Sequence, residues 1–351
     1  MPMMPLPTLT DPTYRADRPS SALDRFFQSL INDPRDVPFL HFIIRANLIV
    51  LPCAIYLFLP GRFSWWLFVP YEALVIFFMG PFVLMLHNTC HRPLFRRRYH
   101  RLNYYIPWGL GPLFGETPDT YYAHHIAMHH PENNLDDDLS STMRYRRDSI
   151  VDFAKYFTRF FFSHFAMSSY FYRRRRFRIL RRLIVGEASF YALVAVLAYF
   201  NFPATFTVLV MPFLLCRFGM MSGNWAQHAF IDPAHPENPY TNSITCINTA
   251  YNRRCYNDGY HIGHHIRATR HWTEMPVEFS REQAEYARHD AVVFQGIDYF
   301  GVWVCLMLHR YDWLARRYVQ LGETPRSEAE IIELLKSRTR PITVDALAAA
   351  A

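Results

Sequence analysis

Four apolar blocks dominate the sequence, and each is close to the length of a helix that crosses a lipid bilayer. They span residues 39–59, 63–86, 183–200 and 203–222. A transmembrane helix needs about 20 consecutive apolar residues. The chain is 51% hydrophobic and 17% aromatic, which exceeds the usual composition of a soluble enzyme. We therefore predict an all-α integral membrane protein with four transmembrane helices.

The connections between the blocks predict two helical hairpins. Only residues 60–62 separate the first two blocks, and only residues 201–202 separate the last two. Arginine-rich segments at residues 96–98 and 173–182 lie beyond the other ends of the blocks. Because Lys and Arg near span ends mark the cytoplasmic side, we expect both termini and the polar segments in the cytoplasm. The chain is thus predicted to be a multi-pass membrane protein, located in the inner membrane of a bacterium.

This topology divides the chain into three regions. We predict a cytosolic N-terminal segment over residues 1–38 with an amphipathic helix at 23–31, a membrane domain over 39–320, and a polar tail over 321–351 that is helical across 327–337. Within the membrane domain, residues 149–172 are predicted to form a helix in the membrane interface. The arginine runs fit attraction to anionic membrane lipids or docking of an acidic electron carrier. Nucleic-acid binding is not expected in so apolar a chain.

Nine histidines fall into four short clusters, at residues 87–91, 125–130, 224–228 and 261–265. Side chains three or four residues apart lie on one face of a helix, so each cluster can direct its imidazoles toward one point. A zinc site uses three or four protein ligands, so nine are too many for one ion and predict two. Imidazole suits iron, zinc, copper and nickel alike. The predicted ligands are His87, His91, His125, His129, His130, His228, His261, His264 and His265.

Two assignments around the second cluster stay open. His124 competes with His125 as a ligand, although His125 keeps the four-residue spacing to His129. The acidic residues that follow either orient ligand imidazoles as hydrogen-bond acceptors or form a solvated loop. These acidic residues are Glu132, Asp136, Asp137 and Asp138.

Two charged residues inside the apolar blocks are tentative substrate contacts. Glu72 lies near the middle of the second block, where a charge is costly. It either stays protonated inside the helix bundle or lines a substrate tunnel. Arg217 lies about one turn inside the end of the fourth block. It either extends to the lipid headgroups or binds a substrate carboxylate.

The clusters resemble the three histidine boxes of the membrane-bound fatty acid desaturase superfamily. The motifs H-x(3–4)-H, H-x(2–3)-H-H and [HQ]-x(2–3)-H-H correspond to His87–His91, His125–His130 and His261–His265. A further N-x-x-x-H element corresponds to Asn224–His228. The resemblance covers about residues 39–275. It implies a cytoplasmic helical cap that carries a non-haem di-iron site (Fe2+/Fe3+), with His228 as a ligand and Asn224 linked to the metal through water.

The resemblance also implies an oxidoreductase that uses O2 to oxidise a fatty acyl chain, with desaturation as the leading outcome. Oxidative decarboxylation of a free fatty acid to a terminal 1-alkene and acyl hydroxylation are the alternatives within the superfamily. The sequence shows no cytochrome domain, flavin or nucleotide motif, or iron–sulfur cysteine set. We therefore expect an external electron donor, such as a ferredoxin or a cytochrome.

Two other classes of function compete with this interpretation. A membrane zinc hydrolase acting on lipids needs fewer ligands and a nearby general base, and it leaves several histidines without a role. A non-enzymatic lipid or metal transporter predicts histidines within the apolar blocks. Most of the clusters instead lie beyond the block ends, which favours the oxidoreductase.

Overall fold

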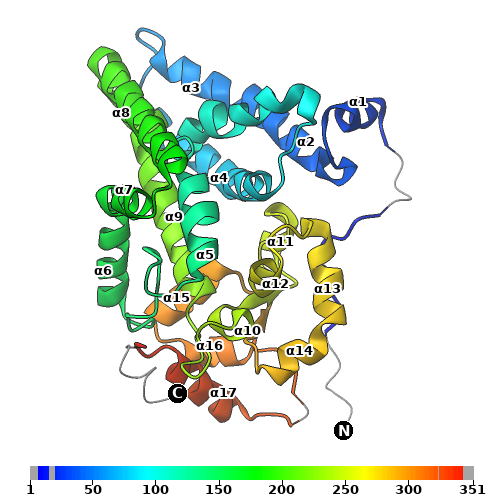
Figure 1. Cartoon of the computed structure of the whole chain (residues 1–351). Coiled ribbons are helices and arrows are strands. Elements are labelled where there is room, and N and C mark those ends of the chain that lie inside the picture. Colours follow the sequence, from blue (N-terminus) through cyan, green and yellow to red (C-terminus); the bar gives the residue numbers. More distant parts are fainter. Residues whose placement is uncertain (1–6, 16–19, 323, 343–351) are drawn as a thin grey trace. The chain divides into compact units, whose positions relative to one another are not determined.

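The computed structural model describes residues 7–15, 20–322 and 324–342, and most of these residues are helical. Long helices carry the apolar blocks and shorter ones carry the polar segments (Figure 1). The chain divides into two compact units. Unit 1 contains residues 1–13, 128–164 and 219–351, and unit 2 contains residues 14–127 and 165–218.

The apolar blocks form three helical runs that are long and apolar enough to cross a membrane. These candidate spans are Pro34–Phe58, Trp65–His91 and Phe177–Gln227. The first two confirm apolar helices at the first two predicted blocks, with somewhat different ends. The helices that make up the three runs are η1 (Pro34–Asp36), α2 (Val37–Arg45), η2 (Ala46–Val50), α3 (Leu51–Phe58), η3 (Trp65–Leu67), α4 (Phe68–His91), α8 (Phe177–Thr205), η8 (Phe206–Val210) and α9 (Met211–Gln227).

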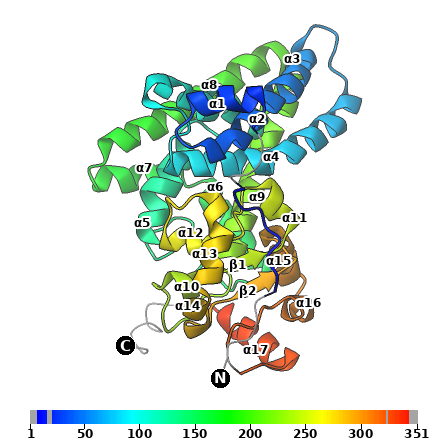
Figure 2. The ribbon, with the colours of Figure 1, turned by 90° about the vertical axis from the view of Figure 1, so that its right-hand side faces the viewer.

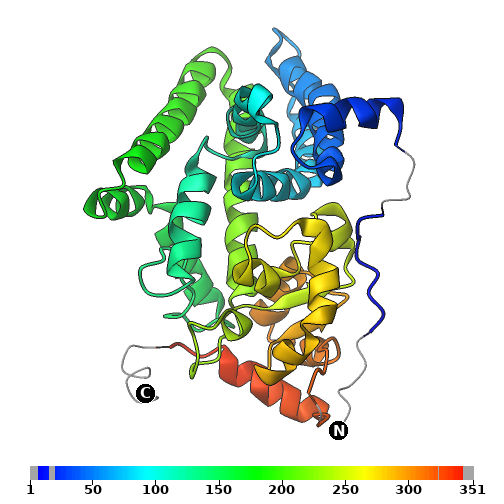
Figure 3. The ribbon, with the colours of Figure 1, turned by 45° about the vertical axis from the view of Figure 1, so that its right-hand side comes forward.

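The third run has 51 residues and combines the third and fourth predicted spans. Its backbone leaves the helical region at Asn201, where φ is −153° and ψ is 83°. The Asn201 side chain accepts a hydrogen bond from the amide of Ala204 (3.2 Å), as an N-cap residue does. Pro203 follows in the first turn, where a proline needs no amide partner. A second helix therefore begins here, within the range of α8, and Figure 3 shows the green part of the ribbon reversing direction. The count of four spans in two hairpins stays a prediction.

Prolines explain the wider helical turns within the candidate spans. The π-helical turns η2 and η8 end just before Pro52 and Pro212, respectively. A proline has no amide hydrogen, and its ring collides with the carbonyl four residues earlier in a regular helix. A widened turn accommodates this collision and lets the apolar helix continue.

Three short helices connect α4 to the second histidine cluster within unit 2. They are η4 (Arg97–Tyr104), η5 (Tyr105–Leu110) and η6 (Gly111–Phe114). The amphipathic helix predicted near the N-terminus is confirmed as α1 (Ala22–Leu30), with a capping box formed by Ser21 and Asp24.

Unit 1 contains one small sheet that the all-α prediction missed. Strands β1 (Thr245–Ile247) and β2 (Val293–Gln295) pair in parallel, with Cys246 opposite Phe294 (Figure 2). Each strand has three residues, which is too short for an alternating pattern to be recognised in the sequence. The sheet lies in the core of unit 1, because Cys246, Ile247, Val293 and Phe294 are fully buried.

The remaining helices of unit 1 are short and surround this core. The predicted interfacial helix corresponds to two helices, α6 (Ile150–Phe161) and α7 (His164–Arg173). All of α6 belongs to unit 1, whereas α7 belongs to unit 2 except for its first residue, His164. The helix predicted in the C-terminal tail is confirmed as α17 (Glu328–Arg338), which packs into the core through Ile331 and Leu335. The others are α5 (His130–Glu132), α10 (Pro239–Asn242), α11 (Ala250–Arg254), α12 (His261–Ile266), η9 (Trp272–Glu274), α13 (Met275–Arg281), α14 (Gln283–Arg288), α15 (Tyr299–Met307) and α16 (Tyr311–Ala315).

A buried arginine attaches the C-terminal segment to the rest of unit 1. The Arg147 side chain is fully buried. Its guanidinium donates hydrogen bonds to the carbonyls of Thr142, Met143 and Ala229 and to those of Arg338 and Arg340. Because carbonyls satisfy its donors, the buried charge is tolerated, and the described part of the tail is packed against the segment that follows the second histidine cluster.

Two glycines in the left-handed region provide a test of packing in unit 2. Gly115 ends η6 with φ +82°, and a Cβ atom there would lie 2.1 Å from the Pro212 carbonyl oxygen. Gly61 has φ +70°, but a Cβ atom there would meet no heavy atom of the described residues within 4 Å. We expect Gly61→Ala to cost about 1–2 kcal/mol from backbone strain alone. We expect Gly115→Ala to cost about 3–5 kcal/mol because overpacking adds to that strain. Thermal unfolding in detergent measures both, and equal shifts would contradict the close approach to Pro212.

Candidate metal centre

Four histidines in unit 1 direct their ring nitrogens toward one another. The possible ligand atoms of His129, His228, His261 and His265 all lie within 4.8 Å of one another. The Nε2 atom of His261 is 3.3 Å from that of His228 and 3.0 Å from that of His265. Two nitrogens bonded to one ion at about 2.1 Å lie roughly 3.0–3.4 Å apart. The spacing therefore fits ligands that share a metal ion.

The outer ring nitrogens of two of these histidines meet buried acceptors. His129 Nδ1 lies 2.6 Å from the Asp138 carboxylate, which in turn accepts from the Ser140 amide and hydroxyl. His228 Nδ1 lies 2.8 Å from the side-chain oxygen of Asn242. An acceptor at Nδ1 holds the hydrogen there and leaves the Nε2 lone pair for a metal.

These contacts separate the acidic residues that follow the second cluster. Asp138 is buried and contacts His129, as expected for a residue that orients a ligand. Asp136 and Asp137 are exposed. The structure thus supports the orienting role for Asp138 and a solvated loop for its two predecessors.

Burial lowers the pKa of two imidazoles in this group. Burial and, to a lesser extent, the neighbouring His129 lower the pKa of His228 to about 4. Burial, together with the surrounding histidines, also holds the pKa of His265 well below its usual value. A metal binds neutral imidazole, so His228 and His265 do not need to lose protons at neutral pH before they bind one.

The short helix α12 places two histidines on one face. His261 and His265 are four residues apart, and their rings lie 4.5 Å apart between centroids. The start of α12 is fixed by buried hydroxyls, because Tyr260 donates to Asp11 (2.7 Å) and Tyr299 donates to the Gly259 carbonyl (2.7 Å). These bonds come from residues far away in the sequence, so the cluster spacing alone does not predict them.

A second pair of histidines in unit 1 also converges. The Nε2 atoms of His130 and His264 are 2.9 Å apart, and the ring centroids are 4.7 Å apart. Each residue is adjacent in sequence to a member of the first group, His129 and His265, respectively. Neighbours in a helix point about 100° apart, so the pair faces a different direction from the four-histidine group.

Unit 2 holds the remaining three histidines close together. His87 and His91 lie at the end of α4, and His125 lies in the π-helical segment η7 (Tyr122–His129). The His87 ring centroid is 4.5 Å from that of His125 and 5.2 Å from that of His91. Tyr121 stacks on His125 at 5.1 Å. The structure therefore brings all nine predicted histidines into contact with another of the nine.

The structure also distinguishes His125 from His124. His125 groups with His87 and His91, with ligand atoms within 4.8 Å of one another. His124 is buried as well, but it belongs to no potential metal-binding group among the described residues. This grouping supports His125 as the ligand.

Asn224 contacts two groups that the sequence did not indicate. Its Nδ2 atom donates to the Ser140 carbonyl (3.0 Å) and to the Tyr156 hydroxyl (2.8 Å). Its backbone carbonyl accepts from the amide of His228. Ser140, Tyr156 and Asn242 have no recognisable spacing relative to the histidines, so only the fold reveals them.

The two tentative substrate contacts, Glu72 and Arg217, are both buried. The carboxyl oxygens of Glu72 have no hydrogen-bond partner among the residues that the structure describes. Arg217 is 6% exposed. Its guanidinium donates to the Thr117 hydroxyl (3.1 Å) and lies over the Phe213 ring. Arg217 thus lies inside unit 2, and the alternative that it extends to the headgroups is wrong.

The grouping of the histidines predicts different effects for adjacent substitutions. His125→Ala should abolish activity and lower the metal content, because it removes a member of the group with His87 and His91. His124→Ala should retain much of both. Metal analysis of the purified variants measures the difference, and the reverse pattern would transfer the ligand role to His124.

Comparison with known proteins adds one finding. The family model described as "Fatty acid desaturase" matches residues 63–296, which is more than half of the chain and includes all four histidine clusters. No curated protein and no solved structure matches the chain.

Proposed function

The chain belongs to the fatty acid desaturase family, and on that premise we propose that it is a di-iron, O2-dependent oxidoreductase that desaturates a fatty acyl chain. Family membership by itself indicates an oxidoreductase acting on fatty acyl chains. The observation that carries the finer proposal is the convergence of the histidine Nε2 atoms in unit 1. The three apolar helical runs support association with a membrane, where such a substrate is found.

The proposal assigns the nine histidines to two iron ions. The four-histidine group of unit 1 is assigned to one of the two ions. Nine imidazoles exceed what one ion needs, and imidazole suits iron as well as other transition metals. The nine proposed ligands are His87, His91, His125, His129, His130, His228, His261, His264 and His265, of which His129, His228, His261 and His265 form the group in unit 1.

Iron, when bound, supplies the reactivity toward O2 and toward an unactivated C–H bond. The residues of the chain do the rest. Asp138 and Asn242 hold the ring nitrogens of His129 and His228 in one tautomer. The apolar helices of unit 2 provide the surroundings in which an acyl chain can lie without water. Oxidation also needs two external electrons per turnover, which we assign to a soluble carrier such as a ferredoxin or a cytochrome.

Metal content and product analysis test this function together. We expect two irons per chain in the active protein, and new double bonds in the acyl chains of a host that expresses it. Elemental analysis measures the first and mass spectrometry of the host lipids and volatiles measures the second. Saturation at one metal, or activity with zinc alone, would contradict the di-iron proposal and favour a lipid hydrolase. A terminal alkene or a hydroxylated chain would replace desaturation by one of the alternatives.

Arg217 favours a second candidate, the decarboxylation of a free fatty acid to a terminal 1-alkene. A buried arginine is normally paired with a carboxylate. Among the described residues, Arg217 contacts a hydroxyl and an aromatic ring. A buried carboxyl, Glu116, is close enough for the charge of Arg217 to oppose the rise that burial causes in its pKa. A substrate carboxylate is a further partner of the right charge.

Kinetics on matched substrates test this role of Arg217. If Arg217 binds a substrate carboxylate, Arg217→Leu should raise KM for a free fatty acid by about 30-fold or more, since losing one buried charged partner costs about 2 kcal/mol or more. KM for a thioester or lipid substrate should change little. Arg45 is an exposed arginine in another candidate span, so Arg45→Leu is the matched control. Unchanged kinetics of Arg217→Leu on the free acid would remove the proposed contact.

A further inference from the structure

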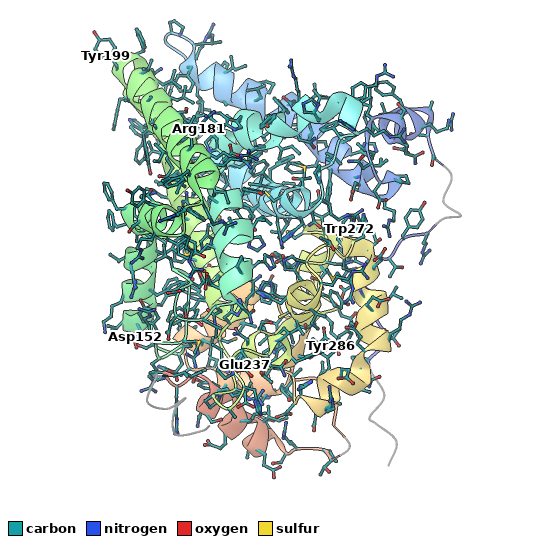
Figure 4. The ribbon with its side chains drawn as sticks, in the orientation of Figure 1. Asp152, Arg181, Tyr199, Glu237, Trp272 and Tyr286 are labelled. Atoms are coloured by element: carbon teal, nitrogen blue, oxygen red, sulfur yellow. The ribbon has the colours of Figure 1, made fainter. Side chains whose placement is uncertain are left out.

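Helix α6 brings one polar side chain, that of Tyr156, into hydrogen-bonding contact with Asn224. The helix begins at Ser149, which caps it by accepting from the amide of Asp152 (3.3 Å), and Figure 4 labels Asp152 in this first turn. Its buried residues are Phe153, Tyr156 and Phe160. Within unit 1 the apolar face of α6 therefore packs inward, and Tyr156 is its only buried residue with a hydrogen-bonding side chain.

Aromatic packing fixes the position of the Tyr156 hydroxyl. The Tyr156 ring is 1% exposed and lies 4.9 Å from the Trp225 ring and 5.8 Å from the Tyr145 ring. Trp225 is itself held, because its indole donates to the Arg147 carbonyl (2.9 Å). Trp225 follows Asn224 directly in α9. The Tyr156 ring therefore packs against the residue next to Asn224, which fixes the Tyr156 hydroxyl relative to the backbone of Asn224.

The hydrogen bonds of Asn224 determine which end of its amide is the nitrogen. The Ser140 carbonyl can only accept a hydrogen bond, so the group 3.0 Å from it must be the NH2 end. The second N–H of that group donates to the Tyr156 hydroxyl (2.8 Å). A flipped amide would place two acceptor oxygens against each other. Both amide hydrogens are therefore used, and Oδ1 remains as the only acceptor of the side chain.

The same residues are linked to the histidine group from two sides. Asn224 lies one helical turn before His228, and its backbone carbonyl accepts from the His228 amide. Ser140 bonds to the Asp138 carboxylate, which contacts His129. The Asn224 side-chain amide is thus held by the segment of Asp138 and Ser140, which also orients His129. Asn224 lies on the same helix face as His228.

We propose that Tyr156 and the Ser140 carbonyl are positioning groups that hold the Asn224 amide with its oxygen, not its nitrogen, available to the metal centre. The inference rests on the proposed di-iron function. Asn224 then serves as a hydrogen-bond acceptor, or as an oxygen ligand, toward whatever occupies the centre beside His228. Tyr156 does not touch the reacting atoms and acts through Asn224.

Tyr156→Phe tests the hydroxyl while keeping the ring. The full-length protein in lipid nanodiscs is loaded with 57Fe(II), and its iron content, Mössbauer spectrum and kinetics are measured. We expect two irons per chain as in the wild type, a changed quadrupole splitting, and a kcat lowered roughly tenfold at unchanged KM, because one buried N–H loses its acceptor. Tyr145→Phe is the matched control from the same aromatic cluster, and it should change neither the spectrum nor kcat.

Substitution of Asn224 tests the orientation without depending on Tyr156. Asn224→Asp places a carboxylate oxygen against the Ser140 carbonyl in either orientation of the side chain. We therefore expect it to lower kcat and alter the Mössbauer spectrum as much as Asn224→Ala does. This result is expected even though a carboxylate is a good ligand for iron. A wild-type spectrum and kcat in Tyr156→Phe, or near-normal behaviour of Asn224→Asp, would overturn the proposal. Failure of the di-iron function is distinct, since the wild type and Tyr145→Phe would then also bind fewer than two irons.

Discussion

The candidate centre in unit 1 depends on hydrogen bonds to the outer nitrogens of its buried histidines. Asp138 accepts at His129 and Asn242 accepts at His228. Each acceptor is itself fixed, Asp138 by Ser140 and Asn242 by donating to the carbonyls of Asn133 and Pro236. In a buried network every member needs a partner. The orientation of the ligands is therefore a property of a whole set of loop residues, and a change in any of them alters the direction in which the Nε2 atoms point.

The long apolar helices of unit 2 carry polar groups at their ends. His87 and His91 lie in the last turns of α4, where the candidate span ends. Prolines widen the apolar helices at η2 and η8 without ending them. The close approach of Gly115 to Pro212, and of Gly186 to Pro118, removes the space that a side chain would need. Backbone contact thus replaces side-chain packing at these two positions.

The proposals for Asn224, Arg217 and the nine histidines concern different roles in one reaction. In these proposals the histidines bind the metal, and the Asn224 amide contributes one oriented oxygen beside His228. Arg217 bears on the form in which the acyl chain is bound. Each depends on burial, because low polarity strengthens both hydrogen bonds and charge interactions. The same burial makes an unsatisfied group costly, which is why Glu72, with no partner for its carboxyl oxygens among the described residues, remains a tentative substrate contact.

The sequence alone determined the helical class, the apolar runs and the nine candidate ligands, because hydrophobic length and histidine spacing are local properties of the chain. It also indicated Asp138, which follows His129 closely. It could not indicate Tyr156, Ser140 or Asn242, because contacts between distant segments depend on how the chain folds. It missed the sheet formed by β1 and β2 for the same reason, since three-residue strands have no periodicity of their own. The four-residue spacing to His129 already favoured His125 over His124, and the tertiary structure supports it by grouping His125 with His87 and His91.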